Sequence, residues 1–452
     1  MSRDHSKGPP GEAGQRGRPP SRKRRSGKKA SGNPGSRPKG LRPGRAKGGH
    51  KGKGVGQSRR SGQVDGRRRP LSHVSGTTHL RGDLEWAERL KLAFMVPEHW
   101  QDLPVQEVHG IHPYPGRLHP AWIRQILDHV EPGSPIYDPF CGSGTVLVEG
   151  MLRGHPVLGS DINGLALRIA RLRTGVRDGP FLEAVTAAAV TAHADAARKR
   201  DTPFARLAKG EKRFPPHVLA QLISLRDSIE HASRGEVREA LLLAFSPLLA
   251  KFGPRGKRPA PNVNRRAVRD HFLRRVQQMV SALADFANTV PAETPEARIQ
   301  CSDARRTPWK KASAGVVITS PPYPGVYDYA AEQGLRERWI GDGSWVDAAR
   351  KAEVGRRGTS EREWSSGMAQ ILDDLCRVVA PGGVVYLVVG DGSFQGRPIR
   401  VDEVLADFED SGRWPLAMRA VASQARPHFH EDGNRAFRDR PRQEHLVMLE
   451  RA

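Results

Sequence analysis

The sequence predicts an α/β protein with a mostly parallel sheet, a helical insertion and a disordered basic tail at the N-terminus. Short apolar runs alternate with amphipathic segments of helical spacing over residues 79–179 and again over 298–452. This alternation is typical of a parallel sheet covered by helices on both faces. Residues 180–297 carry helical periodicity throughout, and residues 1–78 are filled with Gly, Pro, Ser, Lys and Arg. We expect the two α/β stretches to be halves of one domain that the helical segment interrupts.

The basic tail carries most of the chain's net charge of +25, because residues 1–70 contain 22 Lys and Arg against 3 Asp and Glu. A segment with almost no large apolar residues buries too little surface to offset its chain entropy, so we expect it to be disordered. Its charge should attract polyanions, since each neutralised phosphate releases condensed counterions. Attraction to nucleic acid is the favoured interpretation, and a tail that only confers solubility is the alternative.

Cysteine usage and apolar content indicate the compartment. Cys141, Cys301 and Cys376 are far apart and lack Cys-x-x-Cys spacing, which argues against a disulfide framework and a structural zinc site. No apolar run is long enough for a membrane span, and the first residues contain no apolar signal core. We therefore expect a cytoplasmic, nucleoid-associated protein with no membrane partner and no metal.

The first α/β stretch begins with a helix over Leu84–Phe94 and a loop broken by Pro and Gly, HGIHPYPGRLHP at His109–Pro120. A short helix over Ala121–Val130 follows. The loop offers three histidines but no carboxylate or cysteine at ligand spacing, so packing within the loop is favoured over metal binding; the histidines are His109, His112 and His119.

A strand, a glycine turn and a helix then follow within SPIYDPFCGSGT, Ser134–Thr145. The strand is Pro135–Asp138, and the helix begins at Thr145. Such a turn brings free backbone N–H groups close to a ligand, although an ordinary βα turn is an equally good interpretation. A nicotinamide-dinucleotide site is disfavoured, because Leu147 stands where that motif has its third glycine.

A second strand, Pro156–Ile162, contains Asp161 near its end and leads into a helix over Leu165–Leu172. An acid nearly twenty residues beyond a glycine turn suits a carboxylate that accepts hydrogen bonds from ribose hydroxyls. The alternative is that Asp161 caps the helix.

The helical insertion occupies residues 180–297 and contains the basic, irregular loop Gly253–Arg266. This loop suits contact with a phosphate backbone, and a solvated loop is the alternative. Four segments have helical periodicity: Phe181–Arg200, His217–His231, Val237–Phe252 and Val268–Val290.

The α/β pattern resumes with a strand over Ala297–Cys301, followed by Asp303, and a strongly apolar strand over Val316–Thr319. That strand runs into Ser320-Pro321-Pro322-Tyr323, where two prolines end the hydrogen-bonded ladder. The end falls where open α/β sheets bind ligands. A hydroxyl, a fixed backbone and an aromatic ring suit a planar group such as a base, and a rigid turn with an incidental Tyr is the alternative.

The remaining chain predicts a closing hairpin at the edge of the sheet, joined by the polar loop Pro427–Arg442. Before it, Tyr327–Gly358 is rich in loops and mixes Arg and Lys with aromatic residues, which favours contact with a nucleic-acid strand; Trp339 is equally compatible with the core. The predicted elements are a helix over Ser366–Val379, a strand over Val384–Val389, a helix over Ile399–Phe408, and strands over Met418–Ser423 and His445–Glu450.

Two motifs carry a resemblance to a known family. DPFCGSGT (Asp138–Thr145) followed by TSPPY (Thr319–Tyr323) resembles the S-adenosylmethionine-dependent DNA methyltransferases that modify exocyclic amino groups. The serine version is more similar to the N4-cytosine members than to the N6-adenine members. The resemblance covers about residues 105–175 and 298–452. It implies a Rossmann-like class I methyltransferase sheet in which 79–179 and 298–452 are the halves of the catalytic domain.

The resemblance also implies roles for individual residues. Ser320, Pro321, Pro322 and Tyr323 correspond to the catalytic motif, and Tyr323 would stack on the target base. His112 and Tyr114 lie in a segment similar to the one that packs around the methionine moiety of S-adenosylmethionine. Asp161 matches the ribose-binding acid, and Asp303 matches a residue near the adenine. The cofactor motif supplies Asp138, Phe140, Gly142, Ser143, Gly144 and Thr145.

The implied activity is methyl transfer from S-adenosylmethionine to an exocyclic amine, most similar to cytosine N4, of a base flipped out of double-stranded DNA. Enzymes of this kind occur in restriction–modification, where an endonuclease is a possible partner. An RNA base methyltransferase acting on guanine N2 or adenine N6 is the first alternative. Protein glutamine methylation is disfavoured because that family's asparagine is absent. A nucleic-acid-binding protein with an inactive cofactor pocket is the non-enzymatic alternative.

Overall fold

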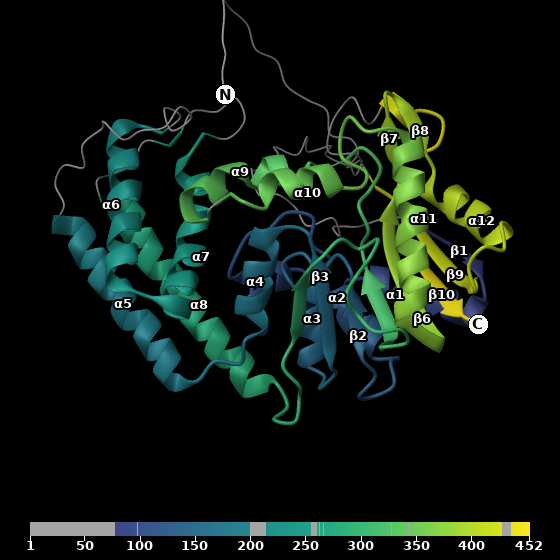
Figure 1. Cartoon of the computed structure of the whole chain (residues 1–452), viewed down its shortest axis with the longest axis horizontal. Coiled ribbons are helices and arrows are strands. Elements are labelled where there is room, and N and C mark those ends of the chain that lie inside the picture. The colour runs from purple at the N-terminus through teal and green to yellow at the C-terminus, as the bar shows by residue number, and fades with distance from the viewer. Residues whose placement is uncertain are drawn as a thin grey trace, which may run out of the picture. The chain divides into compact units, whose positions relative to one another are not determined.

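The computed structural model describes residues 77–96, 98–198, 214–254, 260–261, 263–264, 266–326, 328–341, 343–426 and 435–452 (Figure 1). Almost all of the basic tail, and with it the expected disorder and attraction to nucleic acid, lies outside the described residues. Parts of the loops at 253–266 and 427–442, and Tyr327, lie outside them as well. Among the described residues, no helix is long and apolar enough to cross a membrane.

The core of the molecule is one eight-stranded sheet with the order β1-β9-β10-β6-β5-β2-β3-β4. The strands β4, β3, β2, β5 and β6 are parallel, whereas β10 runs antiparallel to both β6 and β9. Strand β5, from the second α/β stretch, lies between β2 and β6, so the two stretches form one sheet as expected. The bounds are β1 Thr78–Gly82, β2 Ile136–Asp138, β3 Val157–Asp161, β4 Arg298–Cys301, β5 Ala314–Thr319, β6 Val379–Gly390, β9 Leu416–Ala425 and β10 Gln443–Arg451.

Helices cover both faces of this sheet because alternate strand residues point to opposite sides. Ile136 and Ile318 belong to one apolar cluster, and Tyr137 and Val317 to the other. The first cluster packs under α1 Leu84–Phe94, α2 Pro120–Leu127, α3 Thr145–Met151 and α4 Gly164–Thr174, and the second under α11 Glu361–Val378 and α12 Val401–Asp410. Three single-turn 3-10 helices connect α1 to α2: η1 Glu98–Trp100, η2 Leu103–Val105 and η3 Val108–Gly110.

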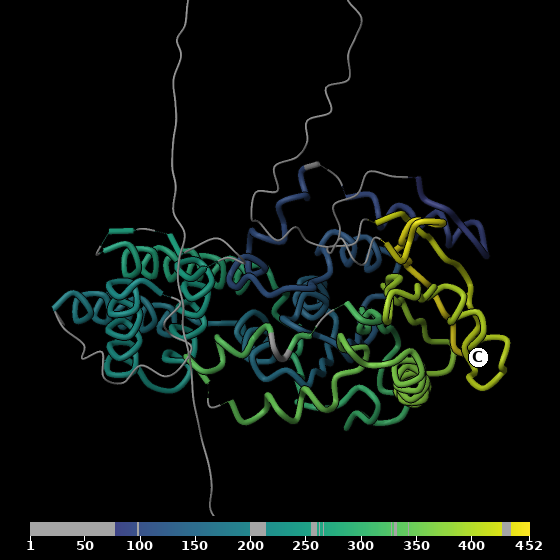
Figure 2. Tube along the Cα trace, turned by 90° about the horizontal axis from the view of Figure 1, so that it is seen from above, coloured from purple at the N-terminus to yellow at the C-terminus, as the bar shows by residue number. Residues whose placement is uncertain are grey.

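The insertion is helical, as its periodicity predicts, and it packs beside the sheet (Figures 1 and 2). Its helices contact one another and share the first apolar cluster with α4. Trp339 of α9 is buried against Phe214 and Phe245, with ring centroids 6.2 and 5.9 Å away, so this Trp belongs to the core. The helices of the insertion are α5 Gly179–Arg198, α6 Pro216–Ala232, α7 Gly235–Phe252 and α8 Ala267–Thr289.

Three sequence-based expectations need correction. The C-terminal hairpin is not the edge of the sheet, because β1 pairs with β9 on its outer side. The stretch expected to be loop-rich contains two helices, α9 Tyr329–Ile340 and α10 Val346–Ala352. Helix α11 begins at Glu361 rather than Ser366, because Ser360 and Glu363 form a reciprocal capping box.

Smaller differences lie next to α12. Strand β6 begins at Val379 rather than at Val384. Ile399 belongs to a short hairpin, β7 Gly392–Phe394 and β8 Arg397–Ile399, so α12 starts at Val401.

Candidate active site

One cavity lies at the carboxyl ends of β2, β3, β4 and β5, where parallel α/β sheets bind ligands. It contains residues from both sequence motifs, because β2 and β5 are neighbours in the sheet. The predicted site residues that line the cavity are Tyr114, Phe140, Gly142, Asp161, Asp303, Ser320 and Pro322. The other predicted residues lie behind this wall.

The glycine turn is bonded directly to the acid at the end of β3. Gly142 and Gly144 have φ angles of +50° and +84°, which favour glycine. The backbone N–H of Gly142 donates to Asp161 Oδ2 over 2.9 Å, and that of Asn163 donates to Oδ1 over 2.8 Å. Gly144 precedes α3, where a Cβ would lie 3.1 Å from the Cβ of Ala170. Burial raises the pKa of Asp161 to about 6.

Asp138 connects the two motifs from beneath the cavity and does not line it. Its Oδ1 accepts hydrogen bonds from Thr319 Oγ1 over 2.6 Å and from the backbone N–H of Phe140 over 3.0 Å. Burial raises the pKa of this carboxyl to about 7. Because Thr319 precedes Ser320, Asp138 fixes the end of β5 relative to the glycine turn.

Arg173, at the end of α4, holds two segments of the cavity wall together. Its guanidinium is fully buried and donates to the carbonyl and the hydroxyl of Ser143 over 2.9 and 2.8 Å. It also donates to the carbonyls of His109 and His112, each over 2.7 Å. Burial lowers the pKa of Arg173. Nothing in the sequence singled out this residue, because an arginine within a helix ordinarily faces solvent.

The remaining predicted cofactor residues face away from the cavity. His112 Nε2 lies 2.6 Å from Ser246 Oγ of α7, and burial holds the pKa of this imidazole well below its usual value. Ser143 faces Arg173, and Thr145 is buried in the first turn of α3. These residues therefore shape the loops that carry Tyr114 and Gly142.

The other two loop histidines also have protein partners. His109 Nε2 lies 2.8 Å from Glu149 Oε1, and Arg124 donates from Nε to Glu149 Oε2 over 2.8 Å. Although burial alone would raise the pKa of Glu149, His109 and Arg124 bring it below its usual value. Glu107, His109 and Glu149 come close enough to share a cation, but Arg124 already contacts both carboxylates. His119 Nδ1 accepts from the N–H of Ala121 and caps α2.

The catalytic motif is divided between the cavity and the core. Ser320 and Pro322 line the cavity, whereas Pro321 is buried outside the lining. Tyr323 is 5% exposed, and its hydroxyl donates to Glu444 Oε1 over 2.8 Å. Arg442 lies over the Tyr323 ring, 5.8 Å from its centroid. The ring therefore does not line the cavity in this conformation.

Asp303 follows β4 and lines the opposite side of the cavity. Its Oδ2 accepts from Arg305 Nη2 over 2.6 Å, and the Arg305 backbone N–H donates to Oδ1 over 2.9 Å. Arg305 also donates to the carbonyl of Ala352, the last residue of α10. Asp303 is thus held in place and one-third exposed.

Two aromatic residues from the stretch after the motif line the cavity, and they come from the segment in which loops were expected. Tyr329 begins α9, and Trp345 precedes α10. Both approach glycines closely: a Cβ on Gly116 would lie 2.7 Å from Tyr329 Oη, and one on Gly164 would lie 2.6 Å from Trp345 Cδ1. We had expected these rings to contact nucleic acid. The signal that could have revealed the wall is Gly164, because the absence of a side chain there leaves room for Trp345.

The strand order defines the class of fold. Five parallel strands, with the antiparallel β10 between β6 and β9, make this the Rossmann-like sheet of class I methyltransferases. A family model for the RMKL-like methyltransferase domain matches residues 125–178. The matched segment contains the glycine turn, Asp161 and Arg173.

Three curated relatives match parts of the chain. The chain is 37% identical over 70 residues to type II methyltransferase M.MvaI of Kocuria varians, a match that covers 15% of each protein. It is 42% identical over 69 residues to type II methyltransferase M.MjaII of Methanocaldococcus jannaschii, covering 15% of this chain and 13% of that protein. The tRNA (guanine(10)-N2)-dimethyltransferase of Methanothermobacter thermautotrophicus is 44% identical over 52 residues, 11% of this chain and 16% of that protein. The chain thus spans about one-seventh of the length of these relatives.

These findings confirm the resemblance to S-adenosylmethionine-dependent amino-methyltransferases, whose cofactor is S-adenosylmethionine. The cavity fits this group. Asp161 offers a carboxylate to ribose hydroxyls, and the turn at Gly142 leaves space for close approach. Tyr329 and Trp345 supply aromatic walls.

Proposed function

We propose that the protein transfers a methyl group from S-adenosylmethionine to an exocyclic amino group of a DNA base, cytosine N4 being the favoured target. The observation that carries this proposal is that Ser320 lines the same cavity as Gly142 and Asp161. The similarity to two type II methyltransferases supports DNA as the substrate.

The residues that would hold the cofactor lie in four segments, one of which is the glycine turn at Gly142. Asp161 would accept hydrogen bonds from the ribose hydroxyls, Asp303 would lie near the adenine, and Tyr114 would contact the methionine moiety. Bound S-adenosylmethionine supplies a methyl group already activated on a sulfonium. The protein therefore has to present the acceptor nitrogen in line with that methyl, which is a task of positioning and electrostatics.

The acceptor amine is a poor nucleophile because its lone pair is delocalised into the base. Hydrogen bonds from its N–H groups to the Ser320 hydroxyl and the Pro321 carbonyl would favour a more tetrahedral nitrogen. The lone pair would then point at the methyl group, and the nitrogen would lose one proton to water once the new N–C bond has formed. The Pro321-Pro322 backbone is rigid, and Trp364 Nε1 donates to the Pro322 carbonyl over 3.0 Å, so this geometry is fixed before substrate binds.

Tyr323 could act in two ways, by stacking on the target base or by holding the turn in place. Flipping a base out of a duplex costs a few kcal/mol, and stacking on an aromatic ring returns about 1–3 kcal/mol. The Tyr323 hydroxyl is bonded to Glu444, which also accepts from Arg426 Nε over 2.9 Å. Stacking would therefore require the ring to move toward the cavity, and without that movement Tyr323 acts by holding the turn in place.

The test removes the Ser320 hydroxyl. We expect Ser320→Ala to lower turnover by about 10²–10³-fold, as loss of one such polar contact to the reacting group does elsewhere, with an unchanged Kd for S-adenosylmethionine. The control is Ser411→Ala, because Ser411 precedes β9, which lies three strands away from β5 in the sheet. Full activity in Ser320→Ala would remove the catalytic assignment.

An RNA base is the second candidate substrate, and the relative that carries it is the tRNA guanine-N2 dimethyltransferase. Incubation of the protein with labelled S-adenosylmethionine and either genomic DNA or total RNA separates the two substrates. Mass spectrometry of the product nucleosides then distinguishes cytosine N4, adenine N6 and guanine N2. Absence of transfer to any nucleic acid would favour a binding protein with an inactive cofactor pocket.

A further inference from the structure

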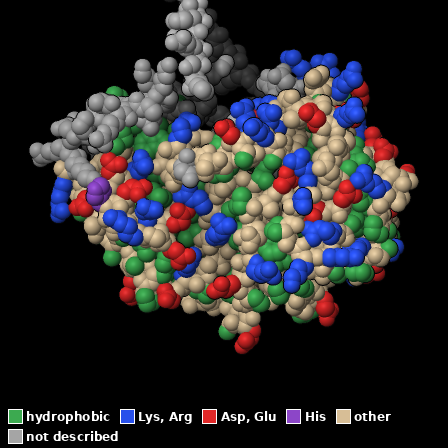
Figure 3. Space-filling view, in the orientation of Figure 1, with side chains coloured by type: hydrophobic (Ala, Val, Ile, Leu, Met, Phe, Trp, Pro, Cys, Tyr) green, Lys and Arg blue, Asp and Glu red, His purple; other side chains and the backbone are tan. Residues whose placement is uncertain are grey.

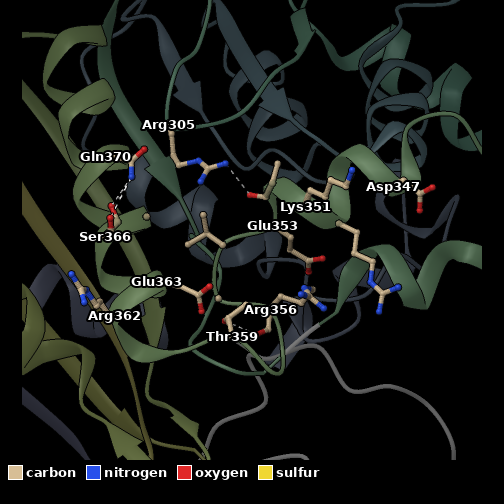
Figure 4. Close-up of a pocket in the computed structure, with 15 residues that line it drawn as sticks. Arg305, Asp347, Lys351, Glu353, Arg356, Thr359, Arg362, Glu363, Ser366 and Gln370 are labelled. Carbon is tan, nitrogen blue, oxygen red and sulfur yellow. Dashed lines mark hydrogen bonds between the residues drawn. The ribbon is translucent and has the colours of Figure 1, made fainter.

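A second and larger hollow lies beside the cofactor cavity (Figure 4). This groove has a volume of about 780 Å³ and lies between α10, the segment 353–359 and the first half of α11. Of its fifteen lining residues, five are cationic: Arg305, Arg350, Lys351, Arg356 and Arg362. We call it the α10–α11 groove.

The α10–α11 groove shares a wall with the catalytic cavity. Ala352, Glu353 and Val354 line both hollows. A polymer bound in the groove would therefore pass the wall of the cavity that contains Ser320. Figure 3 shows Lys and Arg mixed with Asp and Glu over the face seen in Figure 1, so the groove is distinguished by its shape and lining rather than by a wide basic field.

Two of the three acidic residues in the groove, Glu353 and Glu363, have protein partners, and the third is Asp347. Glu363 belongs to the capping box, where hydrogen bonds from Ser360 hold the pKa of its carboxyl below the usual value. Glu353 Oε1 accepts from the backbone N–H of Tyr329 over 2.8 Å. Within the described part of the chain, Lys351 and Arg362 form no salt bridge. Their charges thus remain available to an anion.

The polar lining indicates what kind of anion fits. Besides its cations, the lining contains the hydroxyls of Thr359 and Ser366 and the amide of Gln370, and the described lining residues include no aromatic side chain. Unpaired bases stack on aromatic rings, whereas phosphates are held by Arg, Lys, hydroxyl and amide donors. A volume of about 780 Å³ far exceeds one phosphate ion. The groove therefore suits a sugar–phosphate backbone.

We propose that the α10–α11 groove binds the phosphate backbone of the DNA strand that flanks the target nucleotide. The proposal rests on the proposed function, because a strand in the groove is productive only if its neighbouring base enters the cavity. Lys351 on α10 and Arg362 on α11 contact successive phosphates, and the groove fixes the register of the strand relative to Ser320.

The experiment neutralises the two cations singly and together, as Lys351→Gln, Arg362→Gln and the double variant. Loss of one phosphate contact removes about 0.9 from the slope of log affinity against log salt concentration. We therefore expect KM for duplex DNA to rise about eightfold per substitution at 0.1 M salt, with a flatter salt dependence. The Kd for S-adenosylmethionine, measured by calorimetry, stays unchanged. Arg413→Gln is the control, because Arg413 is exposed, precedes β9 and does not line the groove.

The outcomes separate this proposal from the proposed function. If the unmodified protein methylates DNA and the variants keep its KM and salt slope, the groove proposal is overturned while the function stands. If the unmodified protein methylates no DNA, affinity for a fluorescent duplex replaces KM, and equal affinities overturn the groove proposal independently. Variants that lose affinity for RNA but not for DNA would also overturn it, because the groove would then be an RNA site.

Discussion

Arg173 provides the sharpest test of how the fold supports the cofactor cavity. Replacing it with Met keeps a long, unbranched side chain but removes a fully buried guanidinium. Four hydrogen bonds disappear, two to Ser143 and one each to His109 and His112. These acceptors lie in two loops that are separated by about thirty residues and that carry Gly142 and Tyr114, so Arg173→Met should loosen both walls of the cavity.

The magnitude follows from the bonds that are lost. A hydrogen bond from a charged donor contributes about 1.5–3 kcal/mol, and four bonds from one side chain are not additive. A buried acceptor left without its donor costs about 1–3 kcal/mol, and removal of the buried guanidinium relieves part of its desolvation cost, so we expect the free energy of unfolding to fall by about 3–5 kcal/mol in all. Loss of loop order should also weaken S-adenosylmethionine binding by tenfold or more, which corresponds to about 1.4 kcal/mol.

Urea unfolding and calorimetric titration with S-adenosylmethionine measure the two effects. Arg171→Met is the matched control, because Arg171 is an exposed residue of the same helix. If Arg173→Met does not fold, Arg173→Lys serves instead, since a lysine keeps the charge but lacks the planar fork that reaches both loops. Unfolding free energies within about 1 kcal/mol of the unmodified protein, with an unchanged Kd, would refute the reasoning.

Two further predictions concern the residues around this cavity. The pKa of Asp138 is raised to about 7 in the folded protein, so the folded state binds this proton more tightly than the unfolded chain, and stability is lost as pH rises from about 4 to 7. Asp138→Asn keeps an oxygen acceptor for Thr319 and Phe140 but cannot titrate. We therefore expect the difference in unfolding free energy between pH 5 and pH 8 to be smaller than in the unmodified protein; an equal difference would contradict this prediction. Gly164→Ala should displace Trp345 and weaken cofactor binding, and unchanged tryptophan fluorescence and Kd would show that the ring is not held there.

The sequence predicted the parts of this fold that depend on local pattern. Helix α1 and strand β3 follow from apolar spacing, and the glycine turn and the double proline identified the two ligand-binding ends of β2 and β5. Strand β1 was missed because it is only five residues long, Thr78–Gly82, and these residues are mostly exposed. Helix α9 was missed because its apolar residues pack against the insertion and its own amphipathic pattern is weak.

The role of Arg173 could not be predicted because its environment is assembled from distant parts of the chain. Its acceptors are backbone carbonyls, which every residue has, so no side-chain pattern marks them. The positions of Tyr323 and Glu444 could not be predicted for the same reason. Their hydrogen bond joins residues 121 positions apart, and it decides whether the aromatic ring faces the cavity or the core.

The insertion forms hydrogen bonds with the segments around the cavity at two places, although it lies outside the methyltransferase motifs. Ser246 of α7 lies within hydrogen-bonding distance of His112, two residues before Tyr114. On the other side, Arg168 of α4 bonds both Glu239 of α7 and the carbonyl of Ile340, where α9 ends. Because α9 leads through Trp345 to α10, which borders the α10–α11 groove, a change in the insertion should affect the cavity and the α10–α11 groove together.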